Sequence, residues 1–163
     1  MTETIKISAY FLNRIVVADN KGQAQELYDK SRFGELNEKK IQYSLVEALY
    51  LVEKGKLAVK DDNKLIKQDD FIKKAQKLEK DFWVKYIVFK DMRNRGYIVK
   101  TALKFGADFR VYDRGVKPGE DHAKWVLYPV SETKSFTWYN FSAMNRVAHS
   151  TRKNLLVGIV DSE

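Results

Sequence analysis

Short apolar runs alternate with polar turns through the first part of the chain. Residues 5–18 are rich in Ile, Val and aromatic side chains and are followed by the turn sequence DNKG, which predicts one strand or a broken pair of strands. Ser44 and Glu47 have the spacing of a capping box, and the apolar stripe behind them predicts a helix that stops at Gly55. A short strand is expected over residues 57–60.

A long helix is expected next. Asp69 or Asp70 can cap its first turn, and the pattern predicts that it continues to Arg95 and ends at Gly96. This helix would connect the first part of the chain to the second.

The second part has a different pattern. Three apolar segments, residues 97–103, 107–113 and 123–130, are each bounded by glycine, proline or polar residues and predict strands. Helical spacing of apolar residues predicts a helix over 139–151, and the continuous apolar run at 155–160 is typical of a strand buried on both faces. The expected order is therefore β-β-β-α-β.

These elements predict two domains. Residues 1–80 would form an N-terminal α+β module, and residues 81–163 a C-terminal α/β module with a mixed sheet. The sequence has no linker rich in Pro, Gly or Ser, no internal repeat and no low-complexity tract.

Composition narrows the class of protein. No apolar run approaches the roughly 18 residues of a membrane span, and the N-terminus lacks a signal-peptide pattern, so we expect a cytoplasmic protein that does not enter a membrane. The chain has no cysteine and only two histidines, so any metal would depend mainly on carboxylates. A net charge of +8 fits a polyanionic partner, and it equally fits a lysine-rich solvated surface.

Several common catalytic motifs are missing, namely GxxxxGK[ST], GxGxxG, GxSxG and HExxH. The second half does contain three proton-transfer groups near predicted strand ends: Tyr112, His122 and Lys153. Each also has an ordinary interpretation, as a packed aromatic ring, an exposed loop histidine and a solvated lysine. Spacing alone does not select these three residues.

Two stretches carry a resemblance to a known family. Residues 84–115, VKYIVFKDMRNRGYIVKTALKFGADFRVYDRG, and residues 146–161, RVAHSTRKNLLVGIVD, resemble the signature stretches of archaeal tRNA-splicing endonucleases. SLVEALYL in the first half resembles the N-terminal domain of that family. The resemblance implies that Tyr112, His122 and Lys153 are the catalytic residues and that the C-terminal fold is restriction-endonuclease-like.

The family chemistry needs neither a metal nor another cofactor. It implies that Tyr112 is the general base for an RNA 2′-hydroxyl, that His122 protonates the leaving 5′-oxygen, and that Lys153 stabilises the negative charge of the transition state. The products would be a 2′,3′-cyclic phosphate and a 5′-hydroxyl. Arg146 matches an arginine that stacks on a flipped-out bulge base. We expect a structural role for His149.

The family also implies the substrate and the assembly. The substrate would be precursor tRNA with a bulge-helix-bulge motif, which is cut twice. Two sites imply a homo-oligomer, either a dimer or a tetramer, or a hetero-oligomer with a related subunit. An acidic loop joins subunits in this family, and PVSETKSF offers Glu132 for that role. Family chains typically add one further strand after the last apolar one, so the ending VDSE leaves the mode of assembly open.

Two other functions remain open. Asp121, Glu132 and Lys134 have roughly the spacing of a metal-dependent nuclease in which an acid precedes an ExK motif, although Glu132 lies in a polar turn. The chain could also be a non-catalytic RNA-binding subunit of a heteromeric splicing endonuclease. A complete set of catalytic residues argues against that second alternative.

Overall fold

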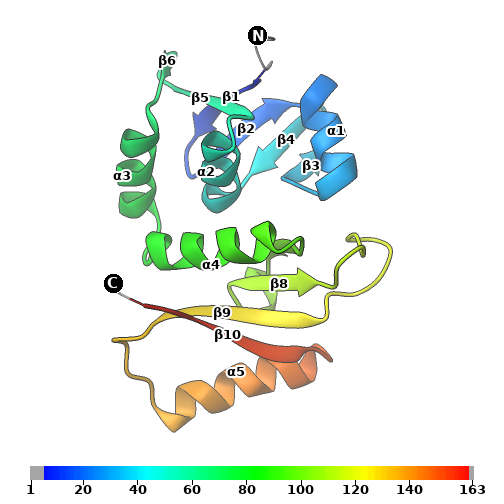
Figure 1. The fold of residues 1–163 in the computed structure, drawn as a ribbon, viewed down its shortest axis with the longest axis vertical. Helices are drawn as coiled ribbons and strands as arrows, with labels where there is room; N and C mark the ends of the chain where they lie inside the picture. The colour runs from blue at the N-terminus through cyan, green and yellow to red at the C-terminus, as the bar shows by residue number, and fades with distance from the viewer. Residues whose placement is uncertain (1–5, 162–163) are drawn as a thin grey trace. The chain divides into compact units, whose positions relative to one another are not determined.

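A computed structural model describes residues 6–161 of the chain. These residues form two compact units, and the division falls between Trp83 and Val84. Each unit contains its own β-sheet (Figure 1). No helix in the described part of the chain is both long and apolar enough to cross a membrane.

The first unit is built on a six-stranded sheet with the order β3-β4-β2-β1-β5-β6. Its strands are β1 (Ile7–Leu12), β2 (Ile15–Asp19), β3 (Glu35–Asn37), β4 (Lys40–Tyr43), β5 (Leu57–Asp61) and β6 (Lys64–Leu65). β1 pairs with β5 in parallel, and the other neighbours are antiparallel. The predicted broken pair is confirmed as the β1–β2 hairpin, and the strand over 57–60 is confirmed as β5. Helix α1 (Gly22–Ser31) and strands β3 and β4 were not predicted.

The predicted capping box begins helix α2 (Leu45–Glu53) as expected. The Ser44 hydroxyl oxygen accepts from the Glu47 backbone N–H, and the Glu47 carboxylate accepts from the Ser44 backbone N–H. The other carboxylate oxygen of Glu47 accepts from the Gly34 N–H at 2.7 Å. Glu47 is 3% exposed, so its buried charge joins the start of α2 to the segment that precedes β3.

The prediction of one helix from about residue 70 to Arg95 was wrong, because the chain forms two helices. These are α3 (Gln68–Leu78) and α4 (Phe82–Asn94), and the N-cap of α3 is Lys67, which leaves both predicted caps inside its first turn. Between the helices Glu79 is extended and Asp81 has a φ of 57°, in the left-handed region. A left-handed residue ends the helical hydrogen-bond pattern without disturbing the apolar spacing that the prediction relied on.

The second unit has a four-stranded mixed sheet with the order β10-β9-β8-β7. The strands are β7 (Ile98–Thr101), β8 (Phe109–Tyr112), β9 (Trp125–Ser131) and β10 (Asn154–Val160), and a short 3₁₀ turn, η1 (Leu103–Phe105), follows β7. β9 and β10 are parallel, and α5 (Trp138–Ser150) connects them. The predicted order β-β-β-α-β and the mixed sheet are therefore confirmed. β7–β8 and β8–β9 are antiparallel pairs.

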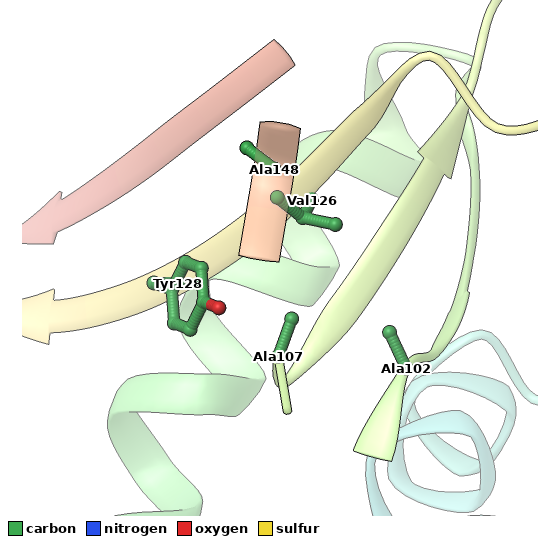
Figure 2. Close-up of a cluster of buried hydrophobic side chains, with 5 residues drawn as sticks. All are labelled: Ala102, Ala107, Val126, Tyr128 and Ala148. Atoms are coloured by element: carbon green, nitrogen blue, oxygen red, sulfur yellow. The ribbon is translucent and has the colours of Figure 1, made fainter. Parts of the chain in front are cut away.

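Helices α4 and α5 cover opposite faces of this sheet (Figure 1). On the α4 face, the rings of Phe89 and Phe109 lie 5.8 Å apart. On the α5 face, small and apolar side chains from β9, α5 and the β7–β8 connection form a buried cluster (Figure 2): Ala102, Ala107, Val126, Tyr128 and Ala148. Small side chains allow α5 to pack close to the sheet.

Tyr128 is the polar member of this cluster. Its hydroxyl donates to the Gly106 carbonyl at 3.1 Å, which ties β9 to the residue that follows η1. Burial raises the pKa of the Tyr128 phenol, and the nearby Asp108 carboxylate raises it further. This tyrosine is therefore neutral at ordinary pH and serves the fold.

The prediction that the strand over 155–160 is buried on both faces was wrong. β10 is an edge strand of the sheet, most of its side chains are half-buried, and Ile159 is 72% exposed. A continuous apolar run is typical of a central parallel strand, but the pattern cannot distinguish a central strand from an edge strand of equal hydrophobicity.

Candidate active site

A pocket in the second unit has a volume of about 530 Å³ and is lined by Tyr112, His122 and Lys153. These are the three residues that the resemblance to the endonuclease family selected. Other side chains of the lining are two further cations, an aromatic ring and two acids: Lys104, Arg110, Phe105, Glu120 and Asp121. The pocket therefore combines positive charge, proton-transfer groups and a ring.

Tyr112 is the last residue of β8. Successive side chains of a strand point to opposite faces, so Phe109 and Val111 face α4 while Arg110 and Tyr112 face the other side. Tyr112 is 6% exposed, and its phenolic oxygen accepts a hydrogen bond from Nε of Arg110 at 3.0 Å. The ring is packed, and the oxygen is held at the pocket.

His122 lies in the loop between β8 and β9. The loop is closed at its base, where the Lys124 N–H donates to the Val111 carbonyl at 2.9 Å. Within the loop, the His122 N–H donates to the Asp121 carboxylate at 2.7 Å. His122 is exposed, so its backbone is fixed by these hydrogen bonds while its imidazole is accessible at the pocket.

Lys153 immediately precedes β10. Its backbone N–H donates to the Ala148 carbonyl at 2.8 Å, and Arg152, with a φ of 57°, turns the chain from α5 into the strand. The Lys153 ammonium donates to the Thr151 carbonyl at 3.2 Å and lies 5.6 Å from the centre of the Phe105 ring. Both contacts hold a flexible side chain at the pocket.

Arg146 and His149 lie outside this pocket. Arg146 is exposed on α5 and is not part of the pocket lining. The imidazole of His149 is also exposed, and the backbone carbonyl of His149 accepts from the Arg152 N–H at 3.1 Å. The contribution of His149 to the fold is therefore made by its backbone.

The proposed metal ligands Asp121 and Glu132 do not come together. Asp121 lies before β9 and lines the pocket, whereas Glu132 directly follows the other end of β9 and its N–H donates to the Val160 carbonyl. A strand of seven residues extends about 23 Å, far beyond the diameter of one metal site. The alternative of a metal site built from Asp121, Glu132 and Lys134 is therefore wrong. Within residues 6–161, no three His, Asp or Glu residues are grouped as metal ligands.

Among the pocket residues that the sequence did not single out are Arg110 and Phe105. A signal for Arg110 did exist, because it lies two positions before Tyr112 and a strand places such residues on one face. Phe105 gave no such signal, because its approach to Lys153 depends on η1 and on the end of α5.

Family models match both parts of the chain. Residues 7–72 match the model described as tRNA intron endonuclease, N-terminal domain. Residues 82–163 match the model described as tRNA intron endonuclease, catalytic C-terminal domain, which covers half of the chain and includes the whole lining of the pocket.

Individual proteins with the name tRNA-splicing endonuclease are similar over most of their length. The protein from Nanoarchaeum equitans is 50% identical over 125 residues, which is 73% of this chain and 81% of that protein. The Methanothermobacter thermautotrophicus protein is 37% identical over 98% of this chain and 92% of its own length. The Pyrococcus horikoshii protein is 40% identical over 96% of this chain and 90% of its own length. The chain belongs to the tRNA intron endonuclease family.

Proposed function

We propose that this chain is an endoribonuclease that excises introns from precursor tRNA at bulge-helix-bulge junctions. Membership of the family supports the substrate class. The observation that carries the proposal is the pocket lined by Tyr112, His122 and Lys153, because it joins a phenol, an imidazole and an ammonium group within the region that matches the catalytic domain.

The proposed reaction is a transesterification within the RNA. Tyr112 accepts the proton of the 2′-hydroxyl, and the 2′-oxygen forms a bond to the adjacent phosphorus. The bond from phosphorus to the 5′-oxygen breaks, and His122 donates a proton to that oxygen. The products are a 2′,3′-cyclic phosphate on one RNA end and a 5′-hydroxyl on the other.

Lys153 stabilises the transition state of this reaction. The phosphoryl oxygens gain negative charge as the 2′-oxygen attacks, and an ammonium held in place by the Thr151 carbonyl and the Phe105 ring needs little reorganisation to meet that charge. Arg146 is proposed to bind substrate outside the pocket, where its exposed guanidinium can stack on a base of the bulge.

The assembly must hold two pockets apart, because an intron is released only by two cuts. We propose a homo-oligomer, either a dimer or a tetramer, or a hetero-oligomer with a related subunit, with Glu132 in a loop that joins subunits. We further assign residues 1–80 to an N-terminal domain and residues 81–163 to the catalytic domain. The β-β-β-α-β order of the second sheet supports a restriction-endonuclease-like class.

The test uses the purified full chain and a minimal bulge-helix-bulge RNA in excess chelator. We expect cleavage at both bulges, and each cut should leave one cyclic-phosphate end and one 5′-hydroxyl end. His122→Ala removes the general acid and should slow cleavage by about 10²- to 10⁴-fold. His149→Ala is the matched control, since that exposed imidazole lies outside the pocket, and it should cleave at the wild-type rate.

Three outcomes contradict parts of this proposal. Cleavage that stops in chelator contradicts the metal-independent mechanism. A His122→Ala variant as fast as wild type removes His122 from the reaction. If the intact chain binds the RNA and leaves it uncut at every protein concentration, the chain is not a self-sufficient enzyme, and light scattering with a related subunit then tests for a heteromeric assembly.

A further inference from the structure

Arg110 is the pocket residue with the most specific contact to a proposed catalytic group. Its Nε donates to the phenolic oxygen of Tyr112 at 3.0 Å, and its guanidinium carbon lies 6.0 Å from the centre of the Tyr112 ring. No role was assigned to Arg110 from the sequence, and the proposed mechanism does not use it.

The guanidinium has a second anchor. Its terminal nitrogen Nη1 donates to the backbone carbonyl of Thr101, at the end of β7. Arg110 is also paired across the β7–β8 ladder with Lys100, so its backbone position is set by the sheet. A planar group held at two points has little freedom to rotate, and Arg110 is itself half-buried.

The chemistry of the guanidinium determines which group donates in this hydrogen bond. Arginine has five N–H donors and no acceptor, so the Tyr112 oxygen can only accept from it. The phenolic hydrogen cannot point toward Arg110 and must point elsewhere around the oxygen. A hydrogen bond from a cation is also stronger when the acceptor oxygen is ionised. Both effects suit an oxygen that must exchange a proton with a group in the pocket.

We propose that Arg110 is a positioning residue, which fixes the phenolic oxygen of Tyr112 toward the pocket through the Nε hydrogen bond and is itself fixed by the Thr101 carbonyl. The inference rests on the proposed role of Tyr112 as general base. Arg110 acts through Tyr112 and is not itself a group that contacts the reacting atoms.

The experiment is a double-mutant cycle measured by single-turnover cleavage of the minimal bulge-helix-bulge RNA. Arg110→Met keeps an apolar stem and removes every donor, while Tyr112→Phe keeps the ring and removes the oxygen. We expect Arg110→Met to lower the maximal rate about tenfold or more in the wild-type background, with less than about a threefold change in the RNA concentration at half-maximal rate. In the Tyr112→Phe background it should change the rate less than about threefold.

Two further variants serve as controls for the cycle. Arg110→Lys keeps one charged donor and should recover part of the lost rate. Arg95→Gln is the charge-matched control: this exposed arginine forms an ion pair with Asp91, lies outside the pocket and should leave the rate unchanged.

The contact can also be observed without catalysis. In full-length protein with ¹³Cζ-labelled tyrosine, the Tyr112 resonance is assigned by its loss in Tyr112→Phe. It should shift in Arg110→Met and not in Arg95→Gln, because the ring carbon beside the oxygen senses the loss of a hydrogen bond. This measurement decides the question even where Tyr112→Phe is too slow for kinetics.

Each contrary result has a separate meaning. An equal loss of rate from Arg110→Met in both backgrounds overturns the inference, since Arg110 would then act independently of Tyr112. A change confined to the RNA concentration at half-maximal rate would make Arg110 a phosphate ligand, which overturns the inference. An unshifted ¹³C resonance in Arg110→Met would mean that Arg110 makes no hydrogen bond to Tyr112, which overturns it as well. If Tyr112→Phe cleaves at the wild-type rate, the proposed function of Tyr112 fails, whatever Arg110 does.

Discussion

The Phe105 ring should matter to catalysis through Lys153, and Phe105→Leu tests this. The ammonium lies 5.6 Å from the ring centre, and Phe105 is 43% exposed, so the contact is of the partly solvated kind. Such cation–π contacts contribute about 0.5–1 kcal/mol. If the whole contribution is lost in the transition state, the rate should fall about two- to fivefold. The hydrogen bond from Lys153 to the Thr151 carbonyl remains, so the loss should be no larger.

The assay is single-turnover cleavage of a minimal bulge-helix-bulge RNA. Tyr10→Leu is the matched control, because the Tyr10 ring has a similar exposure of 41%, has the Lys40 ammonium 5.9 Å from its centre and lies outside the pocket. Lys153→Ala measures the loss of rate when the whole ammonium is removed, and in that background Phe105→Leu should have no effect. A loss clearly greater than about fivefold, or an equal loss with and without the Lys153 ammonium, would refute the reasoning and show that Phe105 serves the fold or the RNA directly.

Three substitutions test the packing inside each unit, and their effect on the free energy of unfolding is measured in urea. A Cβ at Gly158 would lie 2.8 Å from a methyl carbon of Val88, so Gly158→Ala should cost about 1–3 kcal/mol, and combining it with Val88→Ala should recover part of that loss. Glu47→Ala leaves the Gly34 N–H without its carboxylate partner and should cost about 3 kcal/mol. The buried Tyr43 hydroxyl has no hydrogen-bond partner among the described residues, so Tyr43→Phe should stabilise by about 1 kcal/mol. Burial, and then Glu47, raises the pKa of Tyr43 above its ordinary 10.0. Because the folded state disfavours the ionised phenol, the free energy of unfolding should be unaffected by this group below about pH 10 and should fall as the pH rises above it. The wild type should lose up to about 1.4 kcal/mol per pH unit more than Tyr43→Phe in that range, and equal alkaline slopes would contradict the assignment.

Local signals predicted the fold where the deciding interactions are close in sequence. The capping box at Ser44 and Glu47 is such a case, since both partners lie within one helical turn. The break between α3 and α4 was not predictable in this way, because it depends on a left-handed residue, Asp81, for which glycine or asparagine is the usual signal. The edge position of β10 depends on strand order, which apolar periodicity does not specify.

The site shows the same division. Residue chemistry restricted the candidates, the family resemblance selected Tyr112, His122 and Lys153, and these three line one pocket. The place of Arg110 beside Tyr112 could have been predicted from the two-residue period of a strand, whereas the place of Phe105 beside Lys153 is visible only in the tertiary structure. Asp121 and Glu132 illustrate the opposite error, since spacing in the sequence suggested one metal site for two carboxylates that the strand β9 separates.

The mixed sheet explains why the three groups meet. β8 is antiparallel to β9, so the end of β8 lies beside the start of β9, where Val111 pairs with Trp125. β10 is parallel to β9, so its start lies at the same edge, where Asn154 pairs with Trp125. Tyr112, the loop with His122, and Lys153 all adjoin that edge. An antiparallel β10 would place Lys153 near Glu132, at the far end of β9. The return of the chain through α5, a helix of 13 residues, therefore brings Lys153 to the edge that holds Tyr112, since two parallel neighbouring strands need a crossover connection.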